Sequence, residues 1–170
     1  MQGSEEFELK PLSREGIPAA LDKAVRYRLL NEPGEAESIC RDVLRVEPDN
    51  QQALVVLLLA LTDRFGEGHA IAVKQAQEVS AQLRSEYERL YYAGIICERR
   101  AKAQLHLIVP GAGHDAYEWL REAMEWYGKA EAHRLEGNDD ALLRWNACAR
   151  IIMQKRLGPR PEERMESSIE

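Results

Sequence analysis

The sequence predicts an all-α fold built from antiparallel helix pairs, and three observations support this prediction. Apolar residues recur with helical spacing: in the segment 36–44, Ala36, Ile39, Cys40 and Val43 fall at i, i+3, i+4 and i+7. This spacing places an apolar stripe on one side of a helix. No segment of comparable length alternates with the period of two that marks a strand. Glycine, proline, asparagine and aspartate separate the periodic segments, as helix stops and starts do.

Seven helices are expected, joined by short loops. The third of them, with the sequence QQALVVLLLALTDR, is apolar nearly all round. A helix of this kind must be covered on several sides, so it is expected in the middle of a stack. The expected helices cover approximately residues 17–31, 34–46, 50–64, 68–83, 85–109, 115–136 and 139–156.

The two ends of the chain differ from the helical part. Residues 1–16 show little periodicity and are expected to form an N-terminal extension. Residues 157–170 are polar and interrupted by proline, so a disordered tail is expected there. The part between them, 17–156, is long enough to bury a core and is predicted to form one domain.

Composition and charge limit the classes of function. The 170 residues are 45% apolar and 31% charged, as in an ordinary soluble globular protein. The formal net charge of −6 opposes general attraction to nucleic acid or to an anionic membrane. The longest apolar run, Ala53 to Leu61, has nine residues, far fewer than the ~20 that cross a bilayer. The acidic N-terminus is unlike a secretory signal and the three cysteines form no CxxC pair, so a cytoplasmic location is expected.

The segment IVPGAGHDAYEW is the stretch most suggestive of a ligand site. Asp115 followed by Glu118 resembles a capping box that would begin the sixth helix, and Pro110 would help to end the fifth. A phosphate cradle would need more glycine and a Lys or Arg on the anion, and His114 with Glu118 offers only two metal ligands. A turn between helices is therefore the preferred interpretation, with an anion or metal site at 110–115 as the alternative.

The histidines and cysteines show no spacing typical of catalysis or zinc binding. The cysteines mostly fall on apolar stripes, where a small buried side chain is expected. The histidines are expected at the surface or half-buried, so no catalytic, metal-binding or cofactor-binding residue is assigned. The residues concerned are Cys40, Cys97, Cys148, His69, His106 and His133.

Positive charge is concentrated in two stretches, Arg99–Lys102 and Arg150–Arg160. Solvated helix faces account for both, and a docking patch for an acidic partner is the alternative.

Trp119 and Trp126 stand seven residues apart on one side of the sixth helix, so they are expected to pack in the core or between helices.

The segment 17–50 has small residues at corresponding places in two successive helices. Ala24 lies in the first helix with Tyr27 one turn on, Ala36 lies in the second helix, and Pro48 follows it. The alanines allow the helices to approach closely, and the proline ends the second helix. This pattern resembles a tetratricopeptide repeat, a 34-residue helix-turn-helix unit.

Two weaker units follow the first. One begins at Leu54 and lacks the closing proline, and another begins at Leu90 and has a long first helix and an inserted loop. The last helix would be the terminal cap that repeat stacks need. The resemblance spans about residues 17–156 and implies a short right-handed superhelix of stacked antiparallel helix pairs with a C-terminal capping helix.

The resemblance also implies that the first helix of each pair lines a concave groove. Its floor would be apolar, with Tyr91 as the most anchor-like residue, which suits an amphipathic helix or an extended peptide. Family members that hold the acidic tails of heat-shock chaperones use lysines and asparagines where this chain has residues such as Leu21 and Val55, so a chaperone-tail adaptor is not expected. The residues assigned to the groove are Leu21, Val25, Arg28, Val55, Leu59, Asp63, Tyr91, Ile95, Arg99, Leu143 and Arg150.

The expected function is a non-catalytic protein–protein interaction module that binds a peptide or helix of a partner in this groove. Phe7, Leu9 and Leu12 of the N-terminal extension could instead cover the groove, or a homo-oligomer could bury it. The alternative function is a helical protein or enzyme that binds a small molecule or anion at the loop 110–115. RNA binding is a weaker third hypothesis because of the negative net charge, so no nucleic acid and no membrane partner are expected.

Overall fold

The computed structural model describes residues 6–67 and 70–161, and the chain in these ranges is all-α. No strand occurs among the described residues, which confirms the predicted fold class. Two short 3₁₀ helices, η1 (Arg14–Gly16) and η2 (Phe65–Glu67), accompany seven α-helices in this part of the chain. The α-helices are α1 (Ile17–Leu29), α2 (Pro33–Val46), α3 (Gln51–Asp63), α4 (Ala70–Ser80), α5 (Glu86–Leu105), α6 (Ala112–Glu131) and α7 (Asp140–Lys155).

Local sequence explains where several of these helices begin. The side chain of Asn50 accepts a hydrogen bond from the backbone N–H of Ala53 at 2.9 Å and so caps α3. Ser85 caps α5 in the same way through the N–H of Glu88 at 3.2 Å. Pro33 opens α2, a position where its missing N–H costs nothing.

The expected start of α6 was wrong. Gly111 takes a positive φ of 83°, a conformation open to glycine, and lets the helix begin at Ala112. Asp115 therefore lies inside the first turn instead of capping it, and its carboxylate accepts hydrogen bonds from Gln104 and Arg160. The preceding helix, α5, already ends at Leu105, so Pro110 lies in the connection and does not terminate it.

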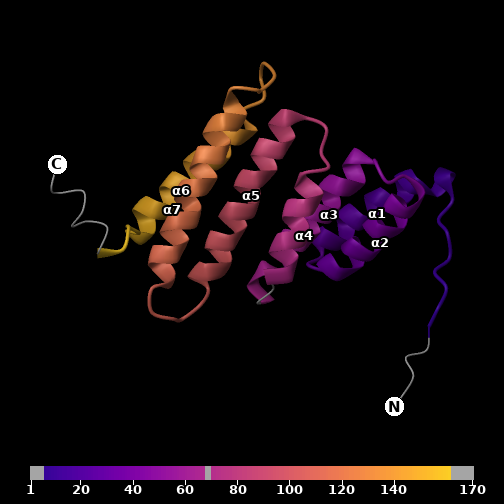
Figure 1. Cartoon of the computed structure of the whole chain (residues 1–170), viewed down its shortest axis with the longest axis horizontal. Helices are drawn as coiled ribbons and strands as arrows, with labels where there is room; N and C mark the ends of the chain where they lie inside the picture. Colours follow the sequence, from indigo (N-terminus) through magenta and orange to yellow (C-terminus); the bar gives the residue numbers. More distant parts are fainter. Residues whose placement is uncertain (1–5, 68–69, 162–170) are drawn as a thin grey trace, which may run out of the picture.

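The helices stand side by side along the long axis of the molecule, from α1 and α2 at one end to α6 and α7 at the other (Figure 1). Each α-helix packs against the next one along the chain, and α1 also contacts α3 while α3 contacts α5. These further contacts bring the odd-numbered helices α1, α3 and α5 onto a common side. Of the consecutive pairs, α4 and α5 share the fewest contacts.

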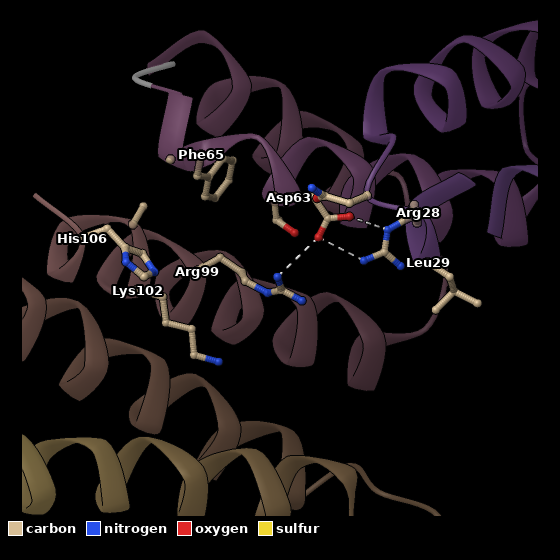
Figure 2. A pocket seen from close by; sticks show the side chains of 11 residues that line it. Arg28, Leu29, Asp63, Phe65, Arg99, Lys102 and His106 are labelled. Carbon is tan, nitrogen blue, oxygen red and sulfur yellow. Dashed lines mark hydrogen bonds and ion pairs between the residues drawn. The ribbon is translucent and has the colours of Figure 1, made fainter. Parts of the chain in front are cut away.

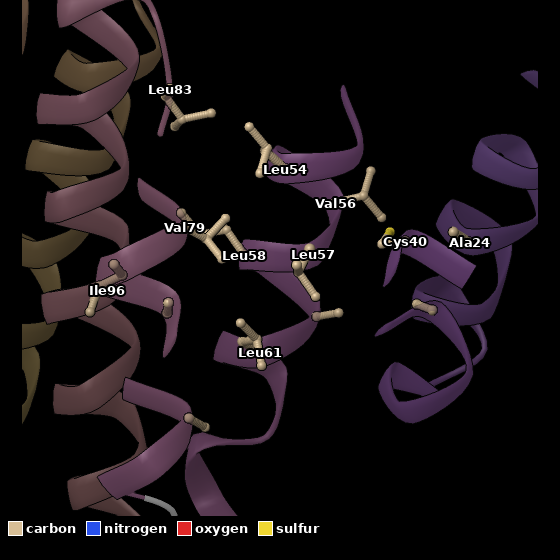
Figure 3. Close-up of a cluster of buried hydrophobic side chains, with 14 of the residues drawn as sticks. Ala24, Cys40, Leu54, Val56, Leu57, Leu58, Leu61, Val79, Leu83 and Ile96 are labelled. Carbon is tan, nitrogen blue, oxygen red and sulfur yellow. The ribbon is translucent and has the colours of Figure 1, made fainter. Parts of the chain in front are cut away.

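The first core surrounds α3, as the all-round apolar sequence predicts. Leu54, Leu58 and Leu61 are almost completely buried there, and α1, α2, α4 and α5 supply their neighbours (Figure 3). Ala24 and Ala36 are fully buried in the same cluster, so the small residues of the predicted repeat do lie between closely packed helices.

The second core lies among α5, α6 and α7. Its buried residues include Leu120 and Tyr127 of α6 together with Cys148 of α7. Gly94 of α5 allows a close approach, because a Cβ atom at this position would stand 2.5 Å from the ring of Tyr127. Trp119 and Trp126 pack against this core from α6, as expected for inter-helix packing.

The described parts of the chain ends run along the surface of the helical part. Phe7 and Leu9 are exposed, so they cover no groove, whereas Leu12 packs beside Ile17 and Leu21. At the other end, Leu157 packs on the second core, so the tail contacts the helices over its first residues. The rest of the expected tail, 162–170, lies outside the described residues.

Among the described helices, none combines the length and the apolar character needed to pass through a bilayer.

Candidate functional site

A pocket of about 390 Å³ opens between the C-terminal parts of α1, α3 and α5 (Figure 2). It lies on the side that these three helices share. Two features of its lining matter for binding: a cluster of charged side chains from all three helices, and an apolar margin. The residues that line it are Arg28, Leu29, Asn31, Thr62, Asp63, Phe65, Gly66, Arg99, Lys102, Ala103 and His106.

Asp63 is the centre of the charged cluster. Its carboxylate accepts hydrogen bonds from Arg28 at 2.7 Å (Nε) and 3.2 Å (Nη2), and another from Nη1 of Arg99 at 3.3 Å. Asp63 is the last residue of α3, and Arg28 lies in the last turn of α1, so the pairing joins two adjacent helix ends. Basic side chains are stabilised at such C-terminal ends by the helix dipole.

A second set of charges lies on α5 beside this cluster. Glu98 is only 1% exposed, and its carboxylate accepts hydrogen bonds from Lys102 of α5 and Tyr127 of α6, each at 2.6 Å, and from Arg144 of α7. A buried carboxylate is stable only when its charge is paired and its oxygens are hydrogen-bonded, and these partners meet both needs.

The two sets together carry an excess of positive charge. The four cations Arg28, Arg99, Lys102 and Arg144 face two carboxylates, those of Asp63 and Glu98, which leaves two positive charges. The chain as a whole has a net charge of −6, so these six residues differ in sign from the average. The guanidinium groups suit carboxylate or phosphate oxygens, which they can bind in a two-pronged manner.

The structure brings together only some of the residues assigned to a groove from the sequence. Arg28, Asp63 and Arg99 meet in the pocket. Leu21 and Ile95 are buried, at 3% and 7% exposure, so neither presents a side chain to a partner.

The remaining groove residues lie in different surroundings. Val55 and Leu59 are half-buried against the first core, and Tyr91 lines a different cavity. Val25, Leu143 and Arg150 are exposed. The residues expected to form one apolar floor are thus divided among the core, half-buried positions and the surface, and the pocket itself combines charged side chains with the exposed Leu29.

Lys102 and His106 line the pocket but were not assigned to the groove from the sequence, although Lys102 belongs to the basic stretch for which a docking patch was the alternative. Lys102 follows Arg99 by three residues and His106 follows Lys102 by four, a helical spacing that could have placed them on the same face as Arg99. Phe65 was also not assigned, because it lies in η2, a helix too short to be predicted from a periodic pattern.

The segment 110–115 was expected to be a loop, but its residues from Ala112 onward belong to α6, and its polar side chains are bonded within the molecule. His114 Nδ1 lies 2.9 Å from the carbonyl oxygen of Gly158, and Asp115 is paired with Arg160. Both contacts join the loop to the chain segment after α7, which explains how the turn is held. Within 6–67 and 70–161, no group of three or more His, Cys, Asp or Glu side chains is placed to hold a metal ion.

The three thiols are buried and free, as expected from the apolar stripes. Burial raises the pKa of Cys40 and Cys97 to about 12 and that of Cys148 to about 11. A thiol of this kind remains protonated at neutral pH and makes a poor nucleophile.

The remaining histidines lie apart from the thiols. His106 follows the end of α5 at the pocket, and His133 stands 3.7 Å from a carboxylate oxygen of Glu86. His69 lies outside the described residues.

Comparison with family models, with curated proteins and with solved structures gives no significant match for this chain.

Proposed function

We propose that the protein is a non-catalytic interaction module, similar in organisation to tetratricopeptide-repeat proteins, that binds a segment of a protein partner on the side formed by α1, α3 and α5. The observation that supports this most directly is the pocket at which Arg28, Asp63 and Arg99 meet, because three parallel elements contribute to one binding surface. We further propose that the partner segment carries an acidic residue.

The arginine cluster has capacity for a further carboxylate. A guanidinium group has five N–H donors, and Asp63 uses two of those on Arg28 and one of those on Arg99. An incoming carboxylate would therefore find donors on both arginines, and it would neutralise part of the excess positive charge.

Apolar surface beside the cluster suits the rest of such a segment. Leu29 lines the pocket and is 82% exposed, and Val25, one turn earlier on α1, is 37% exposed. An apolar side chain next to the acidic one would cover Leu29 and Val25, and such burial contributes about 25 cal/mol for each Å² removed from water. The proposed recognition pattern is an acidic residue flanked by an apolar one.

The cytoplasmic location expected from the sequence remains part of this proposal. A reducing compartment is compatible with three buried, unpaired thiols. The negative net charge favours a protein partner over nucleic acid.

The test is a selection of random displayed peptides on the full chain. The matched variants are Arg99→Glu, which reverses one charge in the pocket, and Arg26→Glu, which makes the same change on another face of the helix that carries Arg28. Equal helical circular dichroism and equal thermal midpoints establish that both variants are folded before binding is compared.

The proposal expects enriched peptides that contain Asp or Glu and that bind Arg99→Glu at least about tenfold more weakly than the wild type, while Arg26→Glu binds them normally. Peptides that bind all three proteins equally would place the binding surface elsewhere. A selection that enriches no sequence from a large library would contradict the function as a peptide-binding module.

A further inference from the structure

A second cavity, of about 450 Å³, lies at the opposite end of α5, between its first turns and the connection from α6 to α7. Three tyrosines and three carboxylates dominate its lining. It has no residue in common with the pocket at Arg28 and Arg99. Its lining residues are Ser85, Glu86, Tyr87, Glu88, Tyr91, Tyr92, His133, Leu135, Asn138 and Asp140.

The tyrosines form one continuous aromatic group. The rings of Tyr87 and Tyr91 are stacked with their centroids 5.8 Å apart, and the rings of Tyr91 and Tyr92 meet edge to face at 5.1 Å. The hydroxyl of Tyr87 lies 3.4 Å from Oδ1 of Asn138, which links the group to the connection between α6 and α7. The cavity therefore has a wall of π-systems held in place by packing on the second core.

Carboxylates outnumber basic groups in the lining. Glu86, Glu88 and Asp140 each contribute a carboxylate, and none of the lining residues is a Lys or Arg. His133 is the one basic group in the lining, and it stands beside Glu86. Burial raises the pKa of Tyr91, and the charge of Asp140 raises it further, so the phenol stays neutral at physiological pH.

The helix dipole explains why the three carboxylates occur where they do, but it does not explain the cavity. Glu86 and Glu88 lie in the first turn of α5 and Asp140 in the first turn of α7, where the helix dipole favours acidic residues. The dipole accounts for neither the gathering of both helix starts around one hollow nor the aromatic wall between them.

Negative charge beside aromatic rings is the combination that attracts an organic cation. Aromatic rings bind a cation through their quadrupole, most strongly for cations that lose little hydration on binding, and carboxylates add a Coulombic attraction. A bare metal ion is a poorer match, because the described residues include no cluster of three or more side chains placed to ligate one.

We propose that the cavity formed by Tyr87, Tyr91 and Tyr92 with Glu86, Glu88 and Asp140 binds an alkylammonium cation. The cation comes either from a small molecule of the choline type or from a methylated lysine side chain of a protein, which present the same head group. The inference is independent of the function proposed for the pocket at Arg28 and Arg99, since the two sites share no residue.

The test is a titration of the full chain with choline, followed through the ring resonances of ¹³C-labelled tyrosines at constant ionic strength. The matched ligand control is 3,3-dimethylbutan-1-ol, which has the shape of choline without its charge. We expect saturable shifts with choline at a dissociation constant of about 1–10 mM, and at least about tenfold weaker binding of the neutral analogue.

Two pairs of variants locate the binding site. Tyr87→Leu should weaken choline binding about tenfold, whereas Tyr87→Phe keeps the aromatic face and should bind within about twofold of the wild type. Asp140→Asn should weaken binding about threefold, whereas Asp22→Asn makes the same change of charge on α1 and should have no effect. The Asp140 pair retains all the rings, so it tests the site even if Tyr87→Leu fails to fold.

A peptide with one trimethylated lysine between glycines distinguishes the two sources. Binding at least about tenfold tighter than choline would identify a protein side chain as the ligand, and tighter binding of choline would identify a small molecule. The proposal is overturned by the absence of saturable shifts up to about 50 mM choline, by equal binding of the neutral analogue, or by choline binding that neither Tyr87→Leu nor Asp140→Asn weakens.

Discussion

The helices α1–α4 and the helices α5–α7 are stabilised by different kinds of core. The first core is built from leucines of α3 and from alanines that let neighbouring helices approach. The second core also buries apolar side chains, but a carboxylate, that of Glu98, lies within it and is bonded from α5, α6 and α7. The buried core of the α1–α4 part therefore depends on shape, and its Arg28–Asp63 pair lies half-buried at the helix ends. The α5–α7 core depends on shape and on one set of paired charges.

The two kinds of core differ in how far the sequence alone reveals them. A small-residue pattern leaves a periodic trace in the sequence, as Ala24 and Ala36 do. A buried ion cluster gives no periodic pattern in the sequence, because Glu98 and Arg144 are 46 residues apart. In the sequence, each looks like an ordinary charged residue on the surface of a helix.

The largest effect is expected from a cavity in the first core. Leu58→Ala removes a side chain that is completely buried, and we expect a loss of about 3–4 kcal/mol in the free energy of unfolding. Urea denaturation followed by circular dichroism measures it. Leu143→Ala, at an exposed position of α7, is the control and should change stability by no more than about 0.5 kcal/mol. A loss below about 1 kcal/mol for Leu58→Ala would contradict the central role given to α3.

The next largest effect is expected at the buried ion cluster around Glu98, where the structure also predicts which of two substitutions costs more. Arg144→Met leaves the 1%-exposed carboxylate of Glu98 short of a partner, so we expect a loss of about 2 kcal/mol. Glu98→Gln should cost less, about 1 kcal/mol, because Arg144 and Lys102 are one-third or more exposed and reach water once the charge is gone. Chemical denaturation of both variants tests this order, and a greater loss for Glu98→Gln would show that the cations are the buried partners.

Loss of a helix N-cap should have a smaller effect on stability, of nearly equal size in the α1–α4 part and in the α5–α7 part. Asn50→Ala and Ser85→Ala each remove the N-cap of a helix, α3 and α5 respectively, and should each cost about 1 kcal/mol. Denaturation midpoints with glycine at the same positions provide the control, since glycine at an N-cap costs only a few tenths of a kcal/mol. A large difference between the two alanine variants would mean that tertiary packing, and not the cap, dominates at one of the helices.

The last prediction concerns the ionisation of the buried thiols, which has the smallest effect on stability at neutral pH and a growing effect at alkaline pH. The buried thiols have pKa values of about 11 to 12 in the fold against an ordinary value of 9.0. The stability that they contribute is complete below pH 9 and is lost as the pH rises from there through 11 to 12, because only the unfolded chain ionises readily. The urea midpoint should therefore fall between pH 8 and pH 10.

Thiol labelling at pH 8 checks the same property without a change of pH. A disulfide reagent should react with none of the three thiols in the native protein within the time in which it labels all of them in denaturant. Fast reaction of Cys97 or Cys148 alone would show that the α5–α7 part opens more readily than the α1–α4 part.

The helical order was predictable because period and turn chemistry are local properties. The apolar stripe of α2, the all-round apolar sequence of α3 and the N-cap residue Asn50 each depend on residues within a few positions. The start of α6 was missed because Gly111 can adopt a positive φ that the sequence of Asp115 and Glu118 does not reveal.

The candidate site was predictable only in part, for a related reason. Arg28, Asp63 and Arg99 were placed on one side from repeat spacing, and they do meet. The exposure of each position was not predictable, since Leu21 and Ile95 are covered by neighbours distant in sequence. The cavity at Tyr87 requires the connection between α6 and α7 to return to the start of α5, which no local pattern specifies.

The sparse contact between α4 and α5 has a consequence for how the chain comes apart. Where neighbouring segments interact mainly with the next in line, the free energy of unfolding is a sum of local terms, and the weakest junction sets the boundary between cooperative units. In this protein the sparsest junction between consecutive helices falls at the start of α5, although Ile96 of α5 also packs in the first core. Amide hydrogen exchange should then show α5–α7 and α1–α4 opening as separate units, so that one end of the molecule can lose its structure while the other keeps its own.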